Sequence, residues 1–113
     1  MTKDEMRALL AEQMAKYRAW SHAQLAGRIE AGGGKSADPE VFEGVAPDAT
    51  PYQMEFCIFW DDRARGNVRV VGDLWAVPQK PLLGFIPIYR PDVADDFILA
   101  PDGRFVGEGE ADS

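Results

Sequence analysis

Two adjacent carboxylates, Asp61 and Asp62, stand between two strand-like runs in the stretch FCIFWDDRARGNVRV. A metal site made of carboxylates alone needs several oxygens that converge on one point. The further acids that could contribute are Asp73, Asp95 and Asp96. Residues 61–67, however, contain a Gly-Asn pair suited to a turn and two arginines that can neutralise the two acids. We therefore expect a solvated hairpin loop, and we assign no catalytic and no metal-binding residue.

The run AGGGKS at residues 31–36 ends in the Gly-Lys-Ser of phosphate-binding loops. That motif requires a glycine five positions before Gly34, where this chain has Ile29, and it follows a strand rather than a helix. We interpret the run as the end of a helix, with Gly32 expected to adopt the left-handed backbone conformation.

The chain has one histidine, His22, and one cysteine, Cys57. A thiol nucleophile with an imidazole base remains an alternative, although a cysteine inside a strand is usually inert. A single histidine and a single cysteine exclude an ordinary structural zinc site. No dinucleotide-binding glycine pattern follows any strand-like run. The sequence thus predicts no cofactor and favours a protein that is not an enzyme.

Two capping boxes predict the elements that open the chain. In a capping box, two residues three positions apart each accept a hydrogen bond through the side chain from the backbone N–H of the other. This spacing occurs at Thr2 with Glu5 and at Ser21 with Gln24. Apolar residues then recur at helical spacing after each box. We expect a first helix to about Arg18 and a second helix that ends at the glycine run.

Alternating apolar residues predict strands in the rest of the chain. The strongest pattern is residues 52–60, whose bulkier face should turn to a core. Further strand-like runs are 41–45, 68–77 and 82–89, followed by a hairpin at 95–106. Gly72 interrupts one run and suggests a bulge or a close backbone approach. Helices followed by strands predict an α+β fold in a single domain, residues 1–113. In it the N-terminal helix pair packs on one face of an antiparallel sheet of about four to five strands.

The second face of this sheet has more apolar residues than water should contact. If Met54 and Phe56 face the helices, then Cys57 and Phe59 point the other way. A partner subunit, a bound apolar ligand or the chain's own segment 82–88 could cover them. The residues expected at the ligand or interface surface are Phe59, Val71, Asp73, Trp75, Phe85, Ile88 and Tyr89.

The formal net charge of −7 opposes binding to a phosphate backbone, and no cluster of basic residues overcomes it. We therefore expect no nucleic-acid partner. No stretch approaches the ~20 apolar residues that span a bilayer, and the first residues do not resemble a signal peptide. Together with a single unpaired cysteine, these features predict a cytoplasmic protein that does not bind membranes.

The segments YQMEFCIFWDD and DDFILAPDGRFVGE, with GNVRVVG between them, resemble a group of small uncharacterised bacterial proteins of the mobile gene-cassette type, as in integrons. The resemblance covers about half of the chain. It implies a helical N-terminus, a Trp-Asp-Asp turn and a closing hairpin, and it implies no activity. This chain departs from the pattern between Trp75 and Pro91, where it is longer and more apolar.

We expect a non-enzymatic binding or interaction protein that self-associates through the apolar sheet face, most simply as a homodimer. The alternative is a small-molecule-binding protein or enzyme with a pocket between the sheet and residues 81–91. In that pocket Asp73, Trp75 and Tyr89 would hold the ligand.

Overall fold

The structure, a computed structural model, describes residues 1–76 and 91–108. In these residues the chain forms two helices followed by four strands, which is the predicted α+β fold. The elements are α1 (Lys3–Arg18), α2 (His22–Ala31), β1 (Glu40–Val45), β2 (Pro51–Trp60), β3 (Val68–Ala76) and β4 (Val93–Leu99). The strand-like run at 82–89 lies outside the described residues.

Both helices begin where their capping boxes predict. The Thr2 hydroxyl accepts a hydrogen bond from the Glu5 N–H at 3.1 Å, and the Glu5 carboxylate accepts one from the Thr2 N–H at 2.9 Å. Ser21 and Gln24 make the same reciprocal pair at 3.1 and 2.8 Å. These bonds satisfy N–H groups that the first turn of a helix leaves without a partner.

The end of α2 corrects one expectation from the sequence. Gly32 has φ −89°, whereas Gly33 and Gly34 have φ of 110° and 96° and make the left-handed turn. Gly32 is instead required for space, because a Cβ there would lie 2.3 Å from the Ser36 carbonyl oxygen. Gly34 also accepts a hydrogen bond from the indole of Trp60 at 3.1 Å, so the glycine run holds α2 to β2.

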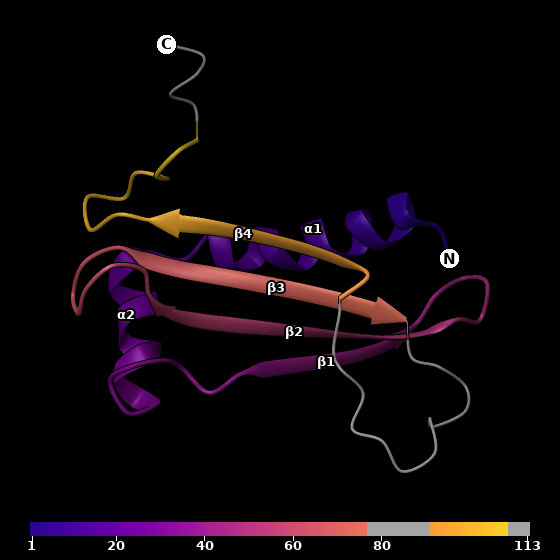
Figure 1. Cartoon of the computed structure of the whole chain (residues 1–113), viewed down its shortest axis with the longest axis horizontal. Coiled ribbons are helices and arrows are strands. Elements are labelled where there is room, and N and C mark those ends of the chain that lie inside the picture. The colour runs from indigo at the N-terminus through magenta and orange to yellow at the C-terminus, as the bar shows by residue number, and fades with distance from the viewer. Residues whose placement is uncertain (77–90, 109–113) are drawn as a thin grey trace.

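The strands form an antiparallel meander in the order β1-β2-β3-β4 (Figure 1). The predicted loop at 61–67 joins β2 to β3, and the Asp61 N–H closes it by donating to the Asn67 carbonyl at 2.8 Å. After β4, Leu99 pairs with Phe105 around a turn in which Gly103 has φ 90°. The predicted closing hairpin is therefore present.

Both helices lie on the same face of the sheet, with α1 against β3 and β4 and α2 against β2 and β3 (Figure 1). The core fills the layer between them with apolar side chains from both helices and from alternate strand positions. The largest fully buried ones are Phe56, Leu10, Met14, Leu25, Ile29, Leu74, Val68 and Val70. None of the helices in the described part of the chain is long and apolar enough to cross a bilayer.

Gly72, in the middle of β3, pairs in unbroken register with Phe56. A Cβ at this position would lie 2.6 Å from the Phe56 ring and 3.0 Å from the Met14 methyl group. Of the two features that the sequence suggested for Gly72, the structure shows the close approach rather than the bulge. The glycine lets the Phe56 ring lie close to the β3 backbone, next to Met14 of α1.

Candidate functional site

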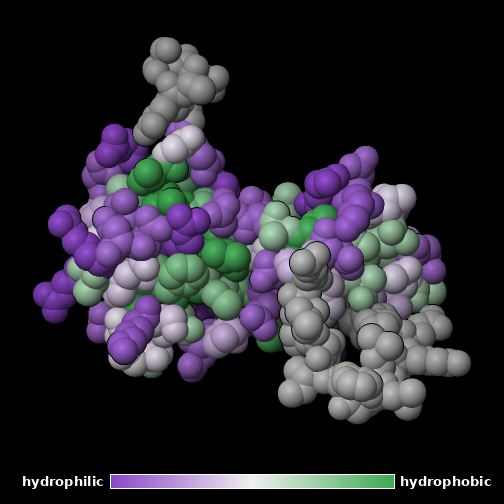
Figure 2. Space-filling view, in the orientation of Figure 1, coloured by the Kyte–Doolittle hydropathy of each residue, from purple (hydrophilic) through white to green (hydrophobic). Residues whose placement is uncertain are grey.

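The face of the sheet turned away from both helices, here the outer face, carries a mixture of apolar and charged side chains. Paired residues of antiparallel strands point to the same face, and Cys57 pairs with Val71 while Phe59 pairs with Arg69. All four side chains are partly buried. Figure 2, which looks onto this face, shows hydrophobic and hydrophilic groups side by side. The sheet thus has apolar residues on both sides.

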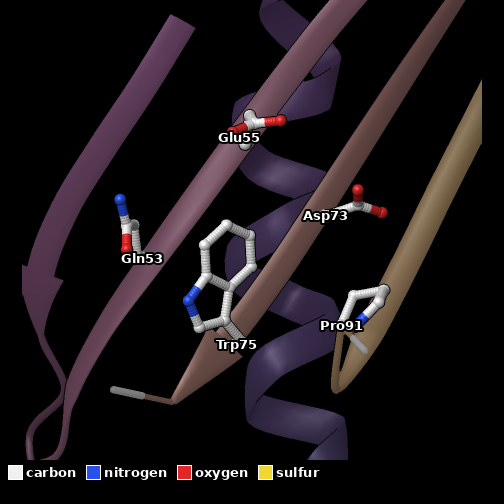
Figure 3. A pocket seen from close by; sticks show the side chains of 5 residues that line it. All are labelled: Gln53, Glu55, Asp73, Trp75 and Pro91. Carbon is white, nitrogen blue, oxygen red and sulfur yellow. The ribbon is translucent and has the colours of Figure 1, made fainter. Parts of the chain in front are cut away.

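A cavity of about 210 Å³ opens on the outer face, and we call it the acidic hollow. Among the described residues, those that line it are Gln53, Glu55, Asp73, Trp75 and Pro91 (Figure 3). Four of them come from two cross-strand pairs, Gln53 with Trp75 and Glu55 with Asp73. Pro91 precedes β4 and closes the side next to Asp73. The hollow therefore combines an aromatic ring, an amide and two carboxylates.

The two carboxylates of the hollow belong to Glu55 and Asp73, which are paired across β2 and β3. Burial raises the pKa of Asp73, and the negative charge of Glu55 raises it further. The Cys57 thiol donates a hydrogen bond to Glu55 at 3.7 Å, while burial and the Glu55 charge raise the pKa of that thiol. Within the described residues, neither carboxylate makes an ion pair.

The acids of the 61–67 loop and of β4 are held differently. The Arg69 guanidinium donates to Asp61 at 2.8 Å and also pairs with Asp96. Asp62 caps the loop, because its Oδ1 accepts the backbone N–H groups of Arg63 and Asn67 at 2.8 and 3.3 Å. Asp61 and Asp62 thus hold the hairpin together, as the sequence favoured. In residues 1–76 and 91–108 no three His, Cys, Asp or Glu side chains come together as a metal-ligand set.

The sheet separates the histidine from the cysteine. His22 Nε2 is bonded to the Gly66 carbonyl at 2.7 Å, and its ring lies 6.1 Å from that of Trp60 on the helix-covered side. Cys57 lies on the outer face. A nucleophile and base pair made of these two residues, which the sequence left open, is therefore wrong.

Of the residues predicted at the site, Asp73 and Trp75 line the acidic hollow, while Phe59 and Val71 lie on the outer face near the 61–67 loop. The remaining predicted site residues, Phe85, Ile88 and Tyr89, lie outside the described residues. Three further lining residues were not predicted from the sequence: Gln53, Glu55 and Pro91. A signal for Glu55 existed, since counting outward from the loop pairs it with Asp73.

The arrangement can hold a group of side-chain size against an indole ring while two carboxylates accept hydrogen bonds from it. Comparisons of the chain with models of protein families, with curated proteins and with solved structures find no match.

Proposed function

We propose that the protein is a non-enzymatic binding protein and that its binding surface is the outer face of the sheet. The observation that supports this proposal is the distribution of apolar residues. Both helices pack on one face, while Cys57, Phe59, Val71 and Trp75 lie on the other. An exposed apolar area framed by polar groups is typical of an interaction surface.

The first form of this function is self-association into a homodimer. The part of the outer face near the 61–67 loop, here the apolar end, has the apolar side chains of Cys57, Phe59, Val71 and Ile98 around the ion pair of Arg69 with Asp96. Burying apolar area stabilises association by about 25 cal/mol per Å². The charge of the chain opposes the dimer, because two copies bring their net −7 charges together. Salt screens this repulsion, so the dimer should tighten as ionic strength rises.

Sedimentation equilibrium at a protein concentration of about 50 µM tests the dimer. At this concentration, a micromolar dissociation constant gives mostly dimer. The wild type should sediment as a dimer at high salt, and Phe59→Ser with Val71→Ser should sediment as a monomer. Val45→Ser is the matched control, since Val45 is 68% exposed on the same face but lies far from the apolar end. A wild type that is monomeric at every salt concentration removes the self-association proposal.

The second form is the binding of a small ligand in the acidic hollow, which the concave shape and mixed lining of that cavity favour. A thermal-shift screen of metabolites tests it. A ligand that binds only the folded state stabilises it by about 2.7 kcal/mol at 100 times its dissociation constant. The shift should disappear in Trp75→Ala and persist in Val45→Ser. Ligands that shift both variants equally do not bind in the hollow.

A further inference from the structure

We infer that the acidic hollow binds an alkylammonium or alkylguanidinium group, with the cation at Glu55 and Asp73 and the alkyl stem against Trp75. This inference rests on the proposed ligand-binding function and adds the charge and shape of the ligand. It requires three properties of the site: an excess of negative charge, apolar walls and too few side-chain oxygens to coordinate a metal ion.

The negative charge is the first property. Glu55 and Asp73 are directly opposed on neighbouring strands, and like charges in that position destabilise a sheet. Arg69 lies on the same face, but it does not neutralise these two carboxylates, because its guanidinium already pairs with Asp61 and Asp96. Since neither hollow carboxylate makes an ion pair within the described residues, a cationic ligand would supply the charge that this pair lacks.

The walls of the hollow suit the rest of such a ligand. Trp75 and Pro91 offer apolar surface for a short alkyl stem, and Trp75 adds the ring type that attracts cations most strongly. The Gln53 side chain has an amide oxygen that can accept one more N–H. An ammonium carries three N–H donors and a guanidinium carries five, so two carboxylates and one amide can satisfy most of them.

The side-chain oxygens of the hollow do not suit a metal ion. Calcium takes six to eight oxygens and magnesium requires a near-octahedral shell. In the part of the chain that the structure describes, no group of three side chains is arranged to hold either. An organic cation needs no such shell, because hydrogen bonds and the indole ring provide its contacts.

The electrostatic field of the surrounding surface also favours a positively charged ligand. Glu43 pairs with Gln53 on the outer face, next to the hollow, and adds a further carboxylate. The protein as a whole carries a formal charge of −7. A cleft lined by one sign of charge raises the local concentration of ligands of the opposite sign. Binding should therefore weaken as salt is added.

The test is a two-dimensional NMR titration of the full chain with n-butylguanidinium and n-butylammonium, with neutral N-butylurea as the uncharged control. The two cations should move the Trp75 indole signal, assigned with Trp75→Phe, and should bind at least about tenfold more tightly than the urea. Equal affinity of cations and urea overturns the inference about charge. It leaves the ligand-binding proposal standing, because the hollow would still bind a small molecule.

Two variants with the same change in net charge locate the cation. The double substitution Glu55→Gln with Asp73→Asn should weaken n-butylguanidinium binding by about tenfold or more. The control Glu12→Gln with Glu30→Gln changes two exposed residues on α1 and α2, on the other side of the sheet, and should change binding by less than about twofold. An equal loss in both variants shows a general charge effect and overturns the site assignment.

A last arm distinguishes the two sources of this cation. N-acetyl-arginine amide carries the guanidinium on a peptide backbone, as a partner protein would, and n-butylguanidinium carries it as a free small molecule. Tighter binding of the arginine derivative assigns the hollow to a partner's side chain, and tighter binding of the free cation assigns it to a metabolite. Failure of both to bind above the level of N-butylurea overturns the inference.

Discussion

Glu55 and Asp73 lie directly opposite one another on β2 and β3, on the face of the sheet that neither helix covers. Two carboxylates in this position repel each other, and both are partly buried. Folding alone does not explain the pair, because a neutral residue at either position would remove the repulsion. A pair of residues that lowers the stability of the fold in this way marks a candidate binding site.

Asp73→Asn should therefore raise the free energy of unfolding at pH 7 by about 1 kcal/mol. The reason is the loss of repulsion with Glu55, so the gain should shrink once Glu55 is already Gln. Urea denaturation of the two single variants and the double variant measures this coupling. Strictly additive effects would show that the two carboxylates do not interact.

The same pair predicts a dependence on pH. The pKa of Asp73 is raised in the folded state, so the folded state holds its proton more tightly than the unfolded chain does. Stability therefore falls as the pH rises from about 4, the ordinary pKa of an aspartate, through the raised value. The advantage of Asp73→Asn over wild type should be absent below about pH 4 and complete at neutral pH. An advantage that is the same at pH 4 and pH 7 contradicts this assignment.

Gly72→Ala should lower the free energy of unfolding by about 1 to 3 kcal/mol, the range for overpacking a core. The new methyl group would lie 2.6 Å from the Phe56 ring, and α1 closes the space on the other side. Gly27→Ala on α2 is the matched control, because nothing lies within 4 Å of a Cβ there. It should stabilise the protein by up to about 1 kcal/mol. Thermal or urea unfolding gives both values, and a neutral Gly72→Ala would show that Phe56 can move aside.

Asp61→Asn should cost about 1 kcal/mol, since it removes the charge from a partly buried hydrogen bond to Arg69. Asp96→Asn should cost less, because Asp96 is 50% exposed, compared with 21% for Asp61. Urea unfolding of the two variants tests this order. The reverse order would show that Asp96 is the main partner of Arg69.

Local patterns in the sequence predicted the elements well, because their causes are local. A capping box involves residues three apart, so both helix starts follow from the sequence near Thr2 and Ser21. The hairpin loop at 61–67 follows from its turn residues in the same way. The position of the left-handed glycine was missed by one residue. Gly32 is set by its contact with Ser36, and that contact depends on the path of the chain after the helix.

The acidic hollow was only partly predictable, because its lining depends on register and on distant residues. Alternation places Asp73 and Trp75 on one face, and the loop length then places Glu55 beside Asp73. Pro91 comes from beyond the end of β3, and no local pattern brings it to Asp73. The sequence also could not show which outer-face acids are already paired, since Arg69 meets Asp96 only through the pairing of β3 with β4.

The meander has one consequence for how the chain folds as it is made. Among the described strands, each pairs with the one next to it in sequence, so the sheet can grow one strand at a time as translation proceeds. α1 breaks this order, because the first helix packs on β4. A nascent chain must therefore keep the apolar side of α1, with Leu10 and Met14, undocked from β4 until that strand has left the ribosome.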